Sequence, residues 1–140
     1  MLVREFMTTP LHSVSVDATL RDIAHVMKTE DIGAVTVEED GEAIGFVTDR
    51  DVVVRGLTME RNPMETRARD VMTDTLVSIS RDASVAEALD AMCEKRIRRL
   101  LVIDENQKVV GIVSMGDLAQ SKEPAEKRAQ ALEGVTRGCC

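Results

Sequence analysis

The chain contains an internal duplication in which about fifty residues of each copy can be aligned. The spacing between matched residues is constant at 65 positions (72 minus 7) up to Val37, and it grows by one in the acidic turn that follows. The matched stretches, first copy before second, are residues 7–8 and 72–73, 13–15 and 78–80, and 45–48 and 111–114. Agreement in size and polarity over this length indicates two copies of one supersecondary unit.

Each copy predicts the order strand, helix, strand, strand, helix. The first helix starts at a capping box, Thr19 with Asp22 in one copy and Ser84 with Glu87 in the other, and its apolar residues recur at helical spacing. Short alternating or apolar runs bounded by turn residues predict the strands. We expect strands at residues 11–16, 34–37 and 43–47, and at residues 76–80, 100–103 and 109–113.

These elements predict an α+β fold with two β-α-β-β-α repeats. A three-stranded sheet alone would leave an apolar face in water, so we expect the copies to pack into one module with pseudo-twofold symmetry. The predicted division is repeat 1 at 4–56, a linker at 57–68, repeat 2 at 69–121 and a C-terminal tail at 122–140. Within the tail, Pro124 and Gly134 predict the start and the stop of one helix.

The overall charge and the apolar pattern argue against nucleic acids and membranes as partners. The formal net charge is -7, and Phe6 and Phe46 are the chain's aromatic residues apart from histidine, so a basic, stacking surface is missing. No run of 18 apolar residues is available to span a bilayer, and the charged start does not match a secretory signal. We therefore expect a cytoplasmic protein.

The cysteines do not indicate a metal site or a disulfide framework. Cys93, Cys139 and Cys140 form an odd count without Cys-x-x-Cys spacing, and the expectation is reduced thiols. The adjacent pair in the polar tail leaves redox activity or cross-linking open as the less favoured alternative.

A hydroxyl followed three residues later by a carboxylate ends both copies. Thr48 with Asp51 and Ser114 with Asp117 each follow an apolar strand that contains glycine, and each opens a second helix. The free N–H groups and the hydroxyl of such a helix start can hold a phosphate, and a carboxylate can accept ribose hydroxyls. The alternative is an ordinary helix cap. Duplication of the pattern at equivalent positions favours ligand binding.

The duplicated pattern resembles the CBS domain pair, or Bateman module, in its compact stand-alone bacterial form, over residues 4–120. The resemblance rests on Gly-Phe-Val-Thr-Asp-Arg-Asp and Gly-Ile-Val-Ser-Met-Gly-Asp at the ends of the copies, and on further matches at residues 7–10, 72–75, 31–35 and 96–100. Thr36 and Leu101 depart from the family because many members have proline there.

The resemblance implies that AMP, ADP, ATP or S-adenosylmethionine binds as a regulatory ligand in two clefts between the repeats, with no cofactor required. One cleft would use Thr48 and Asp51, and the other Ser114 and Asp117. Aliphatic and backbone groups would hold the adenine; the candidates are Thr9, Pro10, Leu11, Ile32, Gly33, Ala34, Val35, Thr75 and Leu76. By analogy with the family, Arg98 and Arg99 would reach the phosphates at Thr48 and Asp51, so that this cleft would prefer more highly charged ligands.

The main functional hypothesis is therefore a ligand-sensing regulatory module, expected to be a homodimer that acts on a protein target not identified by the sequence. The alternative is a nucleotide-free scaffold for dimerisation or protein interaction. We do not expect an enzyme, because His12 and His25 lie outside the paired motifs and no nucleophile with a matching base is evident.

Overall fold

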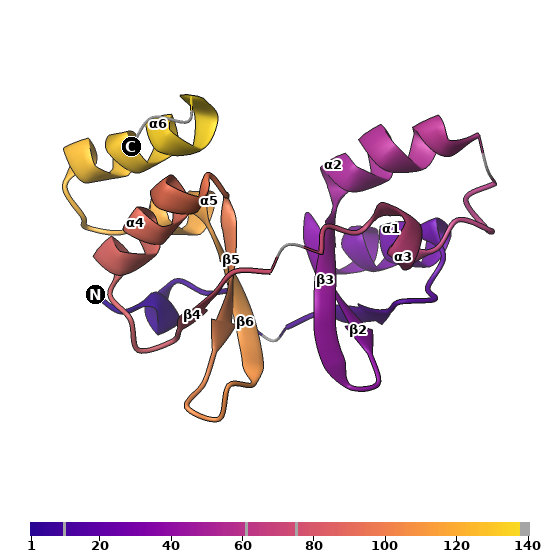
Figure 1. Cartoon of the computed structure of the whole chain (residues 1–140), viewed down its shortest axis with the longest axis horizontal. Coiled ribbons are helices and arrows are strands. Elements are labelled where there is room, and N and C mark those ends of the chain that lie inside the picture. Colours follow the sequence, from indigo (N-terminus) through magenta and orange to yellow (C-terminus); the bar gives the residue numbers. More distant parts are fainter. Residues whose placement is uncertain (10, 61, 75, 138–140) are drawn as a thin grey trace. The chain divides into compact units, whose positions relative to one another are not determined.

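The computed structural model describes residues 1–9, 11–60, 62–74 and 76–137. The chain divides into two compact units, each of which contains one three-stranded sheet flanked by helices (Figure 1). Unit 2 is Leu11–Leu76, and unit 1 combines Met1–Pro10 with Val77–Cys140. The units therefore do not coincide with the sequence copies, because the segment before each first strand belongs to the unit built from the other copy.

The sheet of unit 2 has the order β1-β2-β3. β1 pairs in parallel with β2, and β2 forms an antiparallel hairpin with β3. The strands and helices are β1 (Ser13–Ser15), α1 (Leu20–Glu30), β2 (Ala34–Glu39), β3 (Glu42–Thr48), α2 (Asp49–Asp51), a π-helical turn η2 (Val52–Gly56), a 3-10 turn η3 (Leu57–Met59) and α3 (Ala68–Val71).

Unit 1 repeats this topology with the order β4-β5-β6. Its elements are η1 (Val3–Glu5), β4 (Ser78–Ser80), α4 (Val85–Lys95), β5 (Arg99–Ile103), β6 (Val109–Ser114), α5 (Met115–Leu118) and α6 (Ala125–Arg137). The α+β class and the strand-helix-strand-strand-helix order of both copies are confirmed, although β1 and β4 begin two residues later than predicted.

The predicted capping boxes open the first helix of each unit. The Thr19 hydroxyl accepts from the Asp22 N–H at 3.2 Å, and the Asp22 carboxylate accepts from the Thr19 N–H at 3.1 Å. These hydrogen bonds from Thr19 lower the pKa of Asp22 from its ordinary value. Ser84 and Glu87 form the same pair of bonds in α4. Short local motifs therefore determine where both helices begin.

Each unit has its own apolar core between its sheet and its first helix. The buried core of unit 2 contains Val16, Leu20, Ile23, Val35, Val37, Val47, Ala68 and Val71. That of unit 1 contains Val3, Val85, Ala88, Leu89, Met92, Cys93, Leu100, Val102, Val113, Leu118 and Ala131. At about 25 cal/mol per Å² of buried apolar surface, such clusters are the main stabilising term of each unit.

The segment before each first strand completes the unit built from the other copy. In unit 2, Thr73 pairs with Phe46 of β3 in both directions, at 3.0 and 2.9 Å. In unit 1, the Thr8 N–H donates to the Ile112 oxygen of β6 at 2.8 Å. Glycine permits this approach: a Cβ at Gly45 would lie 2.7 Å from the Thr73 oxygen. A Cβ at Gly111 would lie 3.0 Å from the Thr8 oxygen.

Two expectations for the C-terminal region are wrong. The last helix does not stop at Gly134 but continues to Arg137, because α6 packs along α4 and Gly134 is buried in the contact (Figure 1). Cys93 is disulfide-bonded rather than a reduced thiol. Cys139 and Cys140, for which the sequence left alternatives open, lie outside the described residues.

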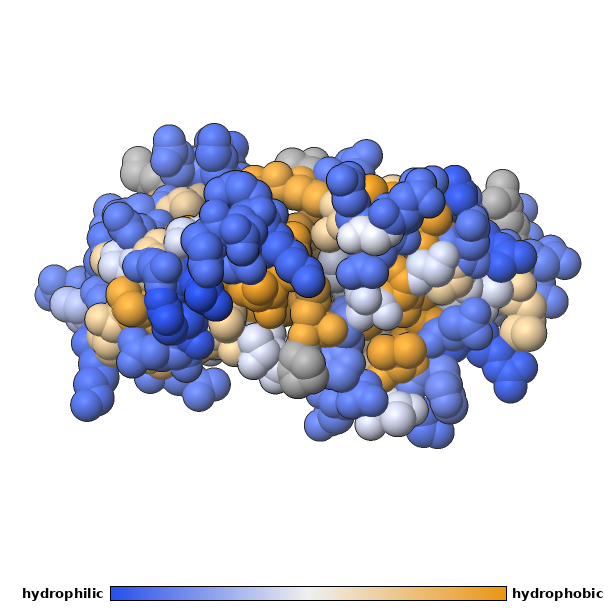
Figure 2. Space-filling view, turned by 90° about the horizontal axis from the view of Figure 1, so that it is seen from below, coloured by the Kyte–Doolittle hydropathy of each residue, from blue (hydrophilic) through white to orange (hydrophobic). Residues whose placement is uncertain are grey.

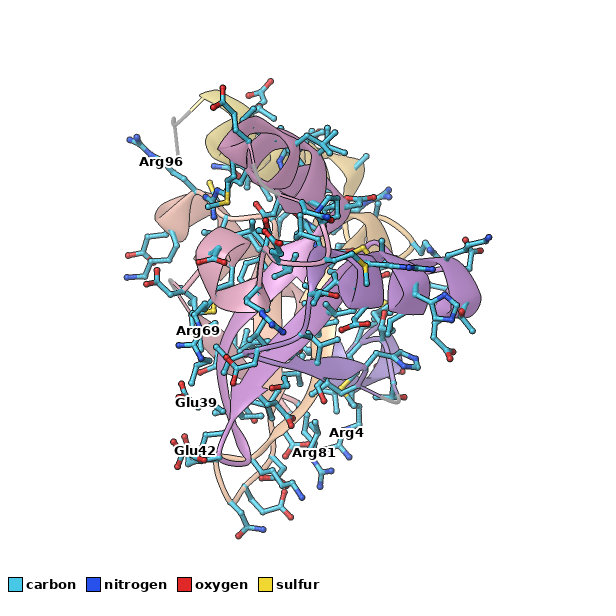
Figure 3. The ribbon with its side chains drawn as sticks, turned by 90° about the vertical axis from the view of Figure 1, so that its right-hand side faces the viewer. Arg4, Glu39, Glu42, Arg69, Arg81 and Arg96 are labelled. Atoms are coloured by element: carbon cyan, nitrogen blue, oxygen red, sulfur yellow. The ribbon has the colours of Figure 1, made fainter. Side chains whose placement is uncertain are left out.

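Charged side chains dominate the surface. Figure 2 shows hydrophilic residues over most of the visible face, with apolar residues exposed between them. In Figure 3, Arg69 lies on the same side of unit 2 as Glu39 and Glu42 at the hairpin end. A hydrogen bond to the Asp17 carboxylate raises the pKa of Arg69, and the charge of Glu39 acts in the same direction. Arg4 and Arg81 lie together in unit 1, where Arg4 pairs with Asp82.

We predict that Gly45→Ala lowers the free energy of unfolding by about 1–3 kcal/mol, because its methyl group would collide with the Thr73 backbone. Gly116→Ala is the matched control: its Cβ would meet only the Ser114 hydroxyl at 3.6 Å, and alanine favours the helix. Urea unfolding measures both variants. Equal stability of the two would show that the close backbone approach does not constrain residue 45.

Candidate functional site

The predicted hydroxyl and carboxylate of unit 2 meet at the start of the helical segment after β3. The Thr48 hydroxyl accepts from the Asp51 N–H at 3.1 Å, and Asp51 Oδ2 accepts from the Thr48 N–H at 3.0 Å. Both residues are 7% exposed. Thr48 and Asp51 therefore form an ordinary helix cap, which was the alternative interpretation of their sequence pattern. Any ligand bound here would have to use groups that also cap the helix.

Two residues that the sequence analysis did not select complete this site. The Thr73 hydroxyl donates to Asp51 Oδ2 at 3.5 Å, and Arg55 Nη1 lies 3.9 Å from Asp51 Oδ1. Arg55 also donates to the oxygens of Val71 and Met72, both at 3.1 Å. Arg55 could have been found from its place one helical turn after Asp51. Thr73 could not, because its contact depends on the tertiary position of the segment before β4.

The equivalent site of unit 1 has the same cap in a more open setting. Ser114 Oγ accepts from the Asp117 N–H at 3.1 Å, and Asp117 Oδ2 accepts from the Ser114 N–H at 2.8 Å. Ser114 and Asp117 are half-buried. The residue at the position equivalent to Arg55 is Ser121. The two helix starts therefore share one backbone geometry and differ in the groups that surround the carboxylate.

The hydrogen bonds define what each site can still offer a ligand. The Thr48 and Ser114 oxygens are acceptors in the caps, so their hydroxyl protons can be donated to a phosphate oxygen. Oδ2 of Asp51 already accepts two bonds, whereas Oδ2 of Asp117 accepts one within its cap. A carboxylate oxygen has two lone pairs, so Asp117 can accept more ligand hydroxyls than Asp51.

The structure places the other predicted residues of unit 2 at different distances from this helix start. Ala34 pairs with Thr48 in the β2-β3 ladder, and the Gly33 oxygen accepts from the Asp49 N–H at 2.9 Å. Ile32 packs against the core, and Val35 is 1% exposed within it. Leu11 and Leu76, the first and last residues of unit 2, are half-buried. Gly33 and Ala34 are therefore beside the site, whereas the Val35 side chain belongs to the core.

Arg98 and Arg99 lie in unit 1 beside Ser114. Arg99 pairs with Ser114 in the β5-β6 ladder, and the Arg98 oxygen accepts from the Met115 N–H at 2.9 Å. The Arg98 side chain is exposed, that of Arg99 is half-buried, and Thr9 is exposed in the same unit. The predicted role of the arginines at Thr48 and Asp51 stays a prediction. Pro10 and Thr75 lie outside the described residues.

Thr36 and Leu101, where the sequence departs from the family that it resembles, are regular strand residues. The Thr36 N–H donates to the His12 oxygen and the Leu101 N–H to the Val77 oxygen, each at 3.0 Å. Proline could not make either bond. The Thr36 hydroxyl is buried and has no hydrogen-bond partner among the described residues. Both strands therefore gain a ladder bond, at the cost of one unpaired hydroxyl in β2.

Neither a metal cluster nor a membrane span is evident in the described part of the chain. No group of three or more histidine, cysteine, aspartate or glutamate side chains in these residues could hold a metal ion. No helix within the same ranges is long and apolar enough to cross a bilayer.

The fold and the duplicated helix starts are those of a known class of domain. The family model for the CBS domain matches residues 3–56 and again residues 68–122. The chain therefore belongs to the CBS domain family, and it carries two copies of the domain. The uncharacterized protein YlbB of Bacillus subtilis is 38% identical over 97% of this chain and 92% of its own length.

Solved CBS domain structures have the same fold. The conserved CBS domain protein TA0289 of Thermoplasma acidophilum aligns over 96% of this chain and 75% of its own, with a TM-score of 0.83 and 23% identity. The CBS domain pair of MJ0100, solved with 5-methylthioadenosine and S-adenosyl-L-methionine, covers 86% of this chain and 94% of its own at 20% identity, with a TM-score of 0.74. CBSX2, solved with AMP, aligns over 85% of this chain and 93% of its own at 22% identity, with a TM-score of 0.68.

We predict that Asp51→Ala reduces the free energy of unfolding by about 1–2 kcal/mol, because the buried Thr48 N–H and the Thr73 hydroxyl lose their acceptor. Asp117→Ala should cost less, about 1 kcal/mol or below, because its site is more open to water. Urea unfolding without added nucleotide measures both, with exposed Glu65→Ala as the control. A larger loss at Asp117 would contradict this ranking.

Proposed function

We propose that the protein is a non-catalytic regulatory module that binds an adenosyl ligand, AMP, ADP, ATP or S-adenosylmethionine, at the two helix starts. The observation that carries this proposal is the duplicated hydroxyl and carboxylate pair, Thr48 with Asp51 and Ser114 with Asp117. Each pair keeps a hydroxyl proton and carboxylate lone pairs that its cap does not use; Thr48 and Asp51 are buried, whereas Ser114 and Asp117 are half-buried.

The proposed division of labour follows from the chemistry of these groups. The hydroxyl donates to phosphate oxygens, because the N–H groups of Asp49, Arg50 and Asp51 already donate within unit 2. The carboxylate accepts from the ribose hydroxyls. The backbone of Gly33 and Ala34 in one unit, and of Arg98 and Arg99 in the other, adjoins the helix start and provides edges against which an adenine can lie. The solved complexes of MJ0100 and CBSX2 with adenosyl compounds support the choice of ligand class.

Regulation would follow if the ligand bound one conformation more tightly than another, because a ligand shifts an equilibrium only by its difference in affinity. We expect the acting form to be a homodimer with a separate protein target. The second candidate function is a nucleotide-free scaffold, and it is favoured by the role of both hydroxyl-carboxylate pairs as helix caps.

We predict that a saturating adenosyl ligand raises the melting temperature, since about 100 times its Kd stabilises the folded state by about 2.7 kcal/mol. AMP, ADP, ATP and S-adenosylmethionine should be compared in thermal-shift measurements, followed by calorimetry for the number of sites. Asp51→Ala and Asp117→Ala should each remove one site.

Guanine nucleotides provide the chemical control, because they offer the same ribose and phosphates with another base. The variant Glu65→Ala should bind as the unaltered chain does. No stabilisation by any adenosyl ligand, with both variants folded, would reject the nucleotide site and support the scaffold.

We predict that Arg98→Ala combined with Arg99→Ala weakens the binding of ATP roughly tenfold more than the binding of AMP. The reason is that guanidinium groups pair with the additional phosphates of ATP. Calorimetry in the Asp51→Ala and Asp117→Ala backgrounds then identifies the site. Loss of ATP affinity only where Asp51 is intact would support the assignment to the Thr48 site. Loss only where Asp117 is intact would instead assign the arginines to Ser114, their neighbour in unit 1.

A further inference from the structure

The helix α6 lies along α4 in unit 1, and the two helices run in the same direction (Figure 1). Lys127 Nζ donates to Asp90 Oδ1 at 2.9 Å, and Cys93 Sγ lies 3.8 Å from the Gln130 oxygen. Both contacts join positions 37 residues apart, so the helices advance together. At this offset α4 ends beside residue 132 (95 plus 37), and the last residues of α6 extend beyond it.

The last turn of α6 buries little apolar surface. Ala131 is 3% exposed within the core of unit 1, and Val135 is half-buried against that core. Glu133 and Thr136 are exposed. Gly134 has no side chain to pack, and glycine disfavours a helix. A helix end built from these residues would fray unless a further contact held it in place.

Cys93 provides such a contact, because its sulfur belongs to a disulfide. The other cysteines of the chain are Cys139 and Cys140, which follow α6 by two and three residues. From Gln130 beside Cys93, the helix rises about 10 Å to Arg137, at about 1.5 Å per residue. Two or three further residues span about 7–10 Å, and the α-carbons of bonded cysteines lie about 5.5 Å apart. The chain after α6 is therefore long enough to return to Cys93.

A groove leads from solvent to this part of the α4-α6 contact. It has a volume of about 220 Å³, and its lining includes Asp90, Cys93 and Glu94 of α4 and Lys127 and Gln130 of α6. The Cys93 residue is 7% exposed, so it is close to the surface although it belongs to the core of unit 1. A small polar thiol can therefore approach the disulfide without prior unfolding of the unit.

We propose that Cys93 and the C-terminal cysteine pair form a reversible thiol–disulfide switch, which holds the end of α6 on α4 when it is oxidised. One of Cys139 and Cys140 forms the bond, and the other remains a thiol. The exchange partner is a low-molecular-weight thiol with its disulfide, of the glutathione type. The bond can open while the unit stays folded, because Lys127 and Ala131 hold the middle of α6 on α4 independently.

Reduction of the switch consumes two molecules of the external thiol. An external thiolate attacks the sulfur of the C-terminal cysteine, the S–S bond breaks, and Cys93 leaves as a thiolate that takes up a proton. A second external thiol attacks the mixed disulfide and releases the C-terminal thiol with one molecule of external disulfide. The chain thereby gains two hydrogen atoms. The new Cys93 thiol can donate to the Gln130 oxygen, so the buried sulfur also has a partner in the reduced state.

Peptide mapping of the unreduced full chain by mass spectrometry tests the bond itself. We expect a peptide containing Cys93 to be linked to one that contains Cys139 and Cys140. Mixtures of reduced and oxidised glutathione should open and close this link reversibly. If Cys93 is unlinked at the oxidising end of the titration, or linked only to a second chain, the proposal is wrong.

Hydrogen exchange measures what the bond does to α6. In the full chain reduced with dithiothreitol, the amides of residues 132–136 should exchange at least about tenfold faster than in the oxidised chain. The amides of α1, in the other unit, are the internal control and should not change.

Cysteine variants assign this effect. Cys139→Ser combined with Cys140→Ser leaves the core residue Cys93 in place and should show the fast exchange with and without dithiothreitol. The two single variants identify the bonded partner. Equal exchange of residues 132–136 in the oxidised and reduced chain, or a response to dithiothreitol that survives in the double variant, would overturn the proposal. These experiments contain no nucleotide, so their outcome is independent of the proposed adenosyl sites.

Discussion

The close approach of two backbones over a glycine is the contact on which both units depend. Thr73 lies against Gly45 of β3 more closely than a side chain there would allow, and Thr8 lies against Gly111 of β6 so closely that a side chain would require a small shift. This contact adds the segment before one copy's first strand to the sheet of the other copy. The chain therefore passes twice from one unit to the other, and neither sequence copy contains all the residues of one compact unit.

The same arrangement explains why the candidate sites sit where they do. In unit 2 the added segment brings Thr73 to Asp51, and Arg55 joins that segment to the helix start through the oxygens of Val71 and Met72. The groups proposed to bind a ligand are thus part of the contact that completes the unit. A ligand that changes the hydrogen bonds of Asp51 would act directly on the segment that leads into the other unit, which gives the proposed sensor function a physical route.

The two units have diverged around a shared framework. The helix caps, the sheet order and the glycine contacts are duplicated, whereas the surroundings are not: Arg55 has Ser121 as its counterpart, and α6 covers only the helical face of unit 1. The residues under α6 are Leu89 and Cys93, and the exposed equivalents in α1 are Ala24 and Lys28. The two helix starts therefore differ in the groups around their carboxylates, and the two first helices differ in how far another helix covers them.

Local patterns in the sequence were sufficient for the elements, for both capping boxes and for the pairing of Thr48 with Asp51 and Ser114 with Asp117, because each depends on neighbours within four residues. Gly134 shows the limit of such reasoning: isolated, it would end a helix, but packing of α6 on α4 carries the helix through it. The exchange of the two starting segments and the contact of Thr73 with Asp51 were decided only by tertiary structure. These contacts join residues far apart in the chain, and the free energy of burying them does not appear in any local pattern.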